Sequence, residues 1–140
     1  MAKLRNESGK FNSRYSIALM NNTKWREVLS EIASIQVVFS IAYIHEEIFG
    51  YSQILCNPDL HEYYIGDGCV IGGPVKYKEI FAVRIERFEE QRNSKTGQIT
   101  SDESKSIKLL EHLKNHGLLP IKIDERHITI YGYKLNLNNG

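Results

Sequence analysis

A run of β-branched and aromatic residues at positions 36–44 constrains the fold of this chain more than any other feature of its sequence. Both faces of the run are apolar, which is typical of a strand inside a sheet and not of an exposed edge. His45, Glu46 and Glu47 are polar and end the run. The sequence therefore predicts a central strand at these positions.

An amphipathic helix of about three turns is predicted before this strand. It begins near Asn22 or Thr23, because either residue offers an oxygen for the N-cap. Its apolar residues fall at i, i+3, i+4 and i+7, and they are Trp25, Val28, Leu29 and Ile32.

A second helix is predicted after residue 100. Thr100 and Glu103 have the spacing of a capping box. Gly117 offers a left-handed stop and Pro120 prevents the helix from continuing. The apolar stripe between these signals consists of Ile107, Leu110 and Leu113.

Further strands are predicted at residues 51–56, 79–88, 121–123 and 128–133. The turn Gly66-Asp67-Gly68 predicts a tight hairpin between residues 62–65 and 69–71. Residues 89–99 are expected to form a polar loop. This order favours an α+β domain with an antiparallel sheet of about five to six strands, and with an N-terminal and a C-terminal helix on one face of it.

The length of 140 residues, with 41% apolar and 25% charged residues, is typical of one globular domain. We expect an N-terminal arm at residues 1–20, a single domain at residues 21–135 and a frayed tail at residues 136–140. Cys56 and Cys69 are expected to be buried free thiols. The sequence has neither the apolar run of a signal peptide nor a membrane span, which predicts a cytoplasmic protein.

Charge is distributed unevenly along the chain. Residues 27–75 contain seven acidic residues and neither Lys nor Arg, whereas the segments on either side are both net basic. Two interpretations remain open at this point. The flanking Lys and Arg side chains fold back and neutralise the acidic segment, or this segment binds a basic partner.

A partner-binding surface is predicted where carboxylates and tyrosines meet at strand ends and turns. Tyr supplies a large contact area at a low entropic cost, and carboxylates pair with the Arg or Lys of a partner. Nucleic acid would be repelled from such a surface. The predicted contact residues are Glu46, Glu47, Tyr51, Asp59, Glu62, Tyr63, Tyr64 and Asp67.

The alternative is a small phosphoesterase-like enzyme that uses His127 and Thr129. His-x-Thr motifs occur in enzymes that cleave cyclic phosphodiesters, where His transfers a proton and Thr orients the phosphate. Such an enzyme needs a second histidine, and His45 or His61 would have to supply it.

The remaining patterns predict neither a metal site nor a cofactor site. His112 and His116 are spaced i, i+4, but no cysteine or carboxylate at a fixed spacing completes a zinc site. A third hypothesis is an oligomeric role for the apolar strand at residues 37–44, so the chain is either a monomer or a homodimer.

The motif Asn21-Asn22-Thr23-Lys24-Trp25 resembles an uncharacterised family of small bacterial domains of unknown function. Weaker similarity extends over residues 21–133, down to the closing Ile130-Tyr131-Gly132-Tyr133. The family implies no catalytic residues. By size and composition the chain also resembles immunity proteins, which implies that it occludes a basic toxin domain through its acidic, Tyr-bearing face.

Overall fold

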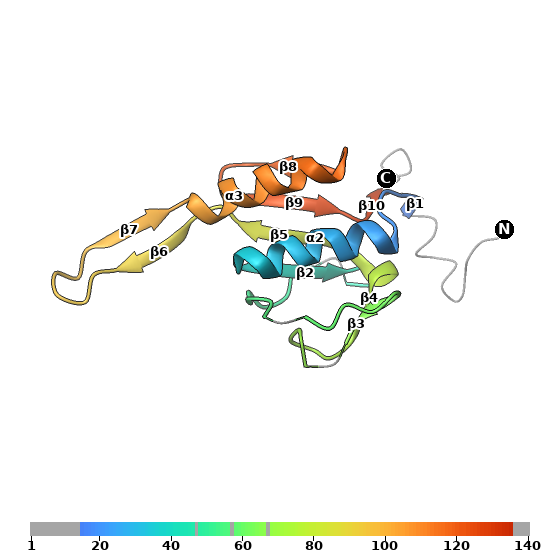
Figure 1. Cartoon of the computed structure of the whole chain (residues 1–140), viewed down its shortest axis with the longest axis horizontal. Helices are drawn as coiled ribbons and strands as arrows, with labels where there is room; N and C mark the ends of the chain where they lie inside the picture. The colour runs from blue at the N-terminus through green and yellow to red at the C-terminus, as the bar shows by residue number, and fades with distance from the viewer. Residues whose placement is uncertain (1–14, 47, 57, 67, 136–140) are drawn as a thin grey trace.

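In the computed structural model, residues 15–46, 48–56, 58–66 and 68–135 are described. Their centre is a four-stranded antiparallel sheet with the order β2-β5-β9-β8 (Figure 1). The sheet therefore has fewer strands than the five to six expected. Its strands are β2 Phe39–Tyr43, β5 Ile80–Glu86, β8 Ile121–Ile123 and β9 His127–Tyr131.

The strand β2 lies at one end of this sheet, which differs from the central position predicted for it. It is nevertheless buried, because the chain after it folds back along its outer edge. Isolated bridges join Phe39 to Gln53 and Ala42 to Phe49. This irregular neighbour replaces the regular strand expected at residues 51–56. The two faces of β2 are apolar because Phe39 and Ile41 belong to the core cluster, while Ala42 belongs to a second buried cluster against which Phe49 packs.

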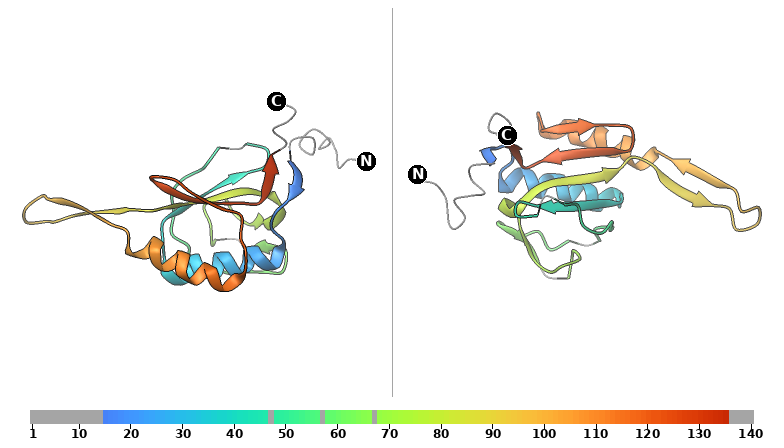
Figure 2. Two further views of the ribbon diagram at one scale, coloured as in Figure 1. Left: turned by 90° about the horizontal axis from the view of Figure 1, so that it is seen from above. Right: turned by 180° about the vertical axis from the view of Figure 1, so that it is seen from behind.

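The helices α2 Asn22–Ile35 and α3 Ser104–Leu113 lie side by side on one face of the sheet (Figure 2). The N-cap of α2 is Asn21, whose side chain accepts a hydrogen bond from the Lys24 amide at 2.7 Å. The predicted capping box of α3 is absent from the described structure. Instead Thr100 belongs to a strand, and Asp102 accepts the Ser104 amide at 2.9 Å.

The hydrophobic core fills the space between the helices and the sheet. Trp25, Leu29 and Ile32 reach it from α2, while Leu109 and Leu113 reach it from α3. Each fully buried side chain of this size contributes roughly 1.5–3 kcal/mol relative to an exposed one. The sheet supplies Phe39, Ile41, Val83, Ile85, Ile128 and Ile130.

Three two-stranded ladders surround the central sheet. The first joins β1 Tyr15–Ala18 to β10 Tyr133–Leu135, so the end of the expected N-terminal arm is part of the fold. The second joins β3 Tyr64–Ile65 to β4 Val75–Lys76, which replaces the predicted hairpin of residues 62–65 with 69–71. Residues 1–14 and 136–140 of the expected arm and tail lie outside the described residues.

The third ladder is a hairpin that projects from the body of the molecule (Figure 1). It joins β6 Glu89–Arg92 to β7 Ile99–Asp102, where a polar loop was expected. Two short 3-10 helices, η1 Tyr77–Glu79 and η2 Lys114–His116, complete the described elements.

Two further findings concern the cysteines and the helices. Cys56 is exposed and Cys69 is half-buried, so the expected burial of both thiols is wrong. Within the described ranges, α2 and α3 are both too short and too polar to cross a membrane.

Candidate protein interface

Residues 44–74 connect β2 to β4 and include β3. We call this segment the connecting lobe. It is anchored to the body by Leu55, Ile65 and Val70, which are buried in the core cluster, and by hydrogen bonds. The buried Tyr77 hydroxyl donates a hydrogen bond to the His61 carbonyl at 2.8 Å, and burial raises the pKa of this phenol to about 12. The Tyr77 amide donates to the Tyr63 carbonyl, and Arg26 Nη1 donates to the Glu62 carbonyl at 2.8 Å.

Most of the predicted contact residues are exposed on the connecting lobe. Tyr51 and Tyr63 have exposed fractions of 78% and 62%. Glu46, Asp59, Glu62 and Tyr64 are exposed as well, whereas Glu47 and Asp67 lie outside the described residues.

The lobe also exposes three isoleucines that were not among the predicted contacts. Ile48 is 72% exposed, Ile54 is 46% exposed and Ile71 is 54% exposed. A large apolar residue next to turn residues is the sequence signal for such exposure. The strands predicted at residues 51–56 and 69–71 instead imply that Ile54 and Ile71 are partly buried. The connecting lobe is therefore more apolar at its surface than the sequence analysis indicated.

Basic side chains lie beside part of the lobe, one from within it and others from neighbouring segments. Asp59 Oδ2 lies 2.8 Å from His61 Nε2. Tyr63 and Tyr64 line a hollow of about 370 Å³ together with Asn22, Lys76 and Lys78. Basic residues of the flanking segments therefore lie close to the part of the lobe around Tyr63.

The histidines proposed for catalysis lie at opposite ends of the sheet. His127 is paired with Glu86 at one end of β5, and His127 Nε2 is 3.2 Å from Glu86 Oε2. His45 follows Tyr43, which pairs with Ile80 at the other end of β5. A strand of this length spans about 20 Å, which is too far for a shared proton transfer.

His61 does not close this distance. Its carbonyl accepts a hydrogen bond from the hydroxyl of Tyr77, the first residue of η1. The helix η1 directly precedes Ile80, at the end of β5 far from His127. Thr129 is 6% exposed and lies between Arg84 and Lys122 in the ladders of the sheet. The described residues therefore do not bring a second histidine to the His127-x-Thr129 motif.

His112 and His116 bind a carboxylate that comes from the other helix. His112 Nδ1 lies 2.9 Å from Glu31 Oε1, and His116 Nε2 lies 2.8 Å from Glu31 Oε2. His116 Nδ1 is also 3.3 Å from Glu27 Oε1. Hydrogen bonds from His116 and then His112 lower the pKa of Glu31. Among the described residues, no group of three or more His, Cys, Asp or Glu side chains could hold a metal ion, and this includes the Glu31 cluster.

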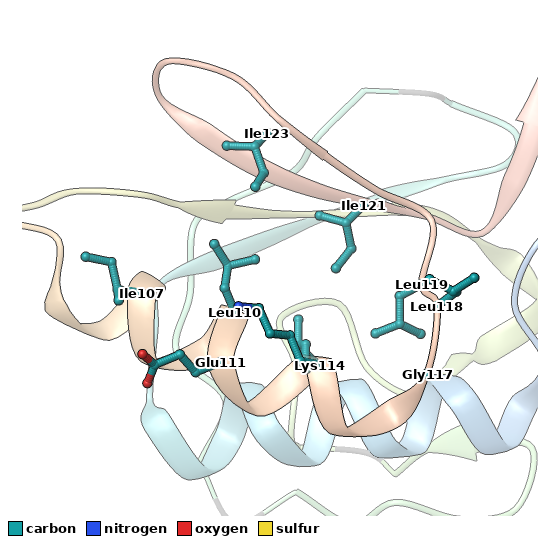
Figure 3. A pocket seen from close by; sticks show the side chains of 10 residues that line it. Ile107, Leu110, Glu111, Lys114, Gly117, Leu118, Leu119, Ile121 and Ile123 are labelled. Carbon is teal, nitrogen blue, oxygen red and sulfur yellow. The ribbon is translucent and has the colours of Figure 1, made fainter.

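An apolar groove lies between α3 and β8 (Figure 3). Its volume is about 580 Å³, and Glu111 and Lys114 provide its only charged lining groups. Ile107 and Leu110 line it, although the sequence analysis placed both in the core stripe of the second helix. Leu113 is buried as predicted, and the other buried residues of α3 are Ser106 and Leu109.

The fold and these surfaces define a small α+β domain with an exposed Tyr- and Ile-bearing lobe. The chain belongs to a family of unknown function, DUF6678, whose model matches residues 8–136. This match confirms the similarity to an uncharacterised family that the sequence indicated. No curated protein and no solved structure matches the chain.

Proposed function

We propose that this protein is a binding module that docks its connecting lobe onto a basic protein. The observation that carries the proposal is the gathering of large exposed apolar residues on one segment, with Ile48, Tyr51 and Tyr63 the most exposed of them. Exposed apolar side chains among polar ones are typical of protein-binding surfaces. Tyr is also enriched among the residues that dominate binding energies.

The exposed carboxylates of the lobe are the reason for proposing a basic partner. Glu46, Asp59 and Glu62 are exposed on the same segment as the apolar residues, and Lys76 and Lys78 line a hollow with Tyr63. We therefore place the centre of the contact at residues 46–54. Carboxylates at this position would steer a basic partner and would pair with its Arg and Lys side chains.

The specific form of the proposal is an immunity protein that occludes the cationic cleft of a toxin. Its carboxylates would take the place of the anionic substrate, so binding would block the cleft. Support for this form comes from the size, the composition and the acidic part of the lobe.

Binding to the protein encoded by the neighbouring reading frame tests the proposal. Calorimetry should give an affinity that falls with rising salt. Tyr51→Ala should weaken it by roughly 2 kcal/mol, as for a central aromatic contact. Reversal of Glu46, Glu47 and Glu62 to Lys together should weaken binding further and flatten its salt dependence.

Glu90→Lys is a matched control, because Glu90 is exposed on the projecting hairpin and far from the lobe in sequence. This variant should bind like the wild type. Unchanged affinity and salt dependence in the triple reversal would exclude the lobe as the contact surface for that partner.

A further inference from the structure

The two edges of the central sheet differ in the described structure. The outer edge of β2 is covered by the connecting lobe, where the Gly50 amide donates to the Ile41 carbonyl at 3.0 Å. The outer edge of β8 pairs with no strand in the part of the chain that the structure describes. An open edge presents backbone donors and acceptors on which another strand can add.

Hydrogen bonds to β9 identify which backbone groups of β8 face outward. The Tyr131 amide donates to the Pro120 carbonyl, and the Asp124 amide donates to the His127 carbonyl. Hydrogen-bonded pairs alternate along an antiparallel ladder, so Lys122 also faces β9. The N–H and C=O groups of Ile123 therefore point to the free edge.

The side chains at this edge are apolar on the face that carries the helices. Ile121 and Ile123 line the groove together with Ile107 and Leu110 of α3 (Figure 3). Ile123 is 52% exposed and Ile107 is 48% exposed. A strand added at β8 would extend the sheet and would bury this apolar strip at the same time.

We propose that a second copy of this chain adds to β8 in antiparallel orientation, with the two-fold axis beside Ile123. In this register Ile123 lies opposite the partner's Ile123, and the two residues exchange both backbone hydrogen bonds. Lys122 then lies opposite the partner's Asp124. The Asp124 side chain is 58% exposed, although its Oδ1 accepts the Arg126 and His127 amides of the same turn. The surface is therefore complementary to itself in charge, as a two-fold interface requires.

A shift of the partner strand by two residues keeps every side chain on the same face of the sheet. In that register Lys122 would lie opposite the partner's Lys122. Like charges directly opposite each other are destabilising. A lysine on a short edge strand also discourages pairing with strands that offer it no carboxylate. Lys122 thus selects the register that brings it to Asp124, and this dimer leaves the connecting lobe free for a separate partner.

Sedimentation velocity over a range of protein concentrations tests the dimer. The wild type should approach twice the chain mass of 16.2 kDa as its concentration rises. Ile123→Asp places two carboxylates at the axis and should weaken dimerisation at least tenfold. Ile71→Asp is the matched control, because Ile71 is 54% exposed on the lobe, and this variant should dimerise like the wild type.

Disulfide trapping tests the register independently of those variants. With Cys56→Ser and Cys69→Ser as background, Ile123→Cys should give a covalent dimer on mild oxidation. The two Cα atoms of a hydrogen-bonded pair are about 5.5 Å apart, which a disulfide can span. Lys122→Cys should not crosslink, because its copies are offset diagonally. A wild type that stays monomeric at every concentration, or equal trapping by both cysteine variants, would overturn the proposal.

Discussion

Glu31 joins the two helices because each of its carboxylate oxygens accepts a hydrogen bond from a different histidine of the α3 end. Lys24 adds a third link, since its ammonium group donates to the His116 carbonyl at 2.9 Å. These bonds connect residues that are more than eighty positions apart in the sequence. They hold α3 in the position from which it lines the groove beside β8.

Replacement of Glu31 by Gln should destabilise the fold by about 1–2 kcal/mol near pH 7, because hydrogen bonds to a charged group are lost. The effect should depend on pH. Hydrogen bonds from His116 and His112 lower the pKa of Glu31 from its ordinary value of 4.5. Because this pKa is lower in the folded protein than in the unfolded chain, the Glu31 carboxylate contributes its full stabilisation above pH 4.5. That stabilisation is lost as the pH falls through the pKa of Glu31 in the folded protein.

Urea unfolding of wild type and Glu31→Gln at pH 7, 5 and 3 measures this difference. It should be the same at pH 7 and pH 5 and should shrink at pH 3. Glu111→Gln on the exposed side of α3 is the control, and it should change stability little at any pH. An equal difference at all three values would contradict a role for the Glu31 charge.

Gly132 occupies a position where no side chain fits. A Cβ atom there would collide with the Ile80 carbonyl oxygen and would lie 3.2 Å from Trp25 Cζ2. The Gly132 amide also donates to the Phe81 carbonyl at 2.7 Å, which prevents an easy shift of the backbone. Gly132→Ala should therefore cost about 2–4 kcal/mol.

Thermal and urea unfolding would measure the cost at Gly132. Gly50→Ala is a suitable comparison, because the nearest atom to its added Cβ is the Ile41 carbonyl oxygen at an ordinary 3.7 Å. That variant should stay within about 1 kcal/mol of the wild type. Similar losses at both glycines would mean that close packing at Gly132 does not limit the fold.

At the scale of elements, local patterns predicted the helices better than the pairing of strands. The stripe Trp25, Val28, Leu29 and Ile32 identifies α2 because its spacing follows from helix geometry alone, and all four side chains are buried. The second stripe is right for Leu113 and wrong for Ile107, because nothing local to α3 indicates that Ile107 lines a groove. Turn residues at Gly66-Asp67-Gly68 were equally misleading, since Ile65 pairs with the distant Val75.

The same limit applied to the candidate sites. Exposure of Tyr51 and Tyr63 followed from their place beside turns, but the basic neighbours of Tyr63 did not. Lys76 and Lys78 reach it because β4 pairs with β3, and such pairing depends on contacts across the fold. Glu31 likewise completes the His112 and His116 pair from another helix, which no spacing within α3 reveals.

The projecting hairpin of β6 and β7 should be dispensable for stability. Every residue from 90 to 101 is exposed, and the side-chain bonds at its base join Arg87 to Glu103 and to Ser106. Replacement of residues 91–100 by Asn-Gly would connect Glu90 and Ser101, which already face each other in the ladder. The free energy of unfolding should change by less than about 1 kcal/mol.

Leu109→Ala is the contrasting change in the neighbouring helix. Leu109 is fully buried in the core cluster, so its truncation should cost about 2–5 kcal/mol. Denaturant unfolding of both variants checks this contrast. A large loss from shortening the hairpin would show that it contributes to the fold beyond its base.

At the scale of the whole molecule, a rigid layer of helices on a sheet carries a less regular lobe. The core cluster joins α2, α3, β2, β5 and β9, and Ile121 of β8 packs against it. The lobe between residues 48 and 62 is attached through the fully buried Leu55, through isolated bridges and through single hydrogen bonds. Segments that rearrange on binding are drawn from such regions of low local stability.

Hydrogen–deuterium exchange measured by mass spectrometry should therefore divide the molecule in two. Peptides from β5 and β9 should exchange slowest, because β5 pairs on both sides and Val83, Ile85, Ile128 and Ile130 are fully buried. Peptides from residues 48–62 should exchange well before them. Protection in the lobe equal to that of β5 would contradict this division. When a basic partner binds, protection should rise at residues 46–54 while β5 and β9 stay unchanged, since residues 46–54 form the centre of the proposed contact.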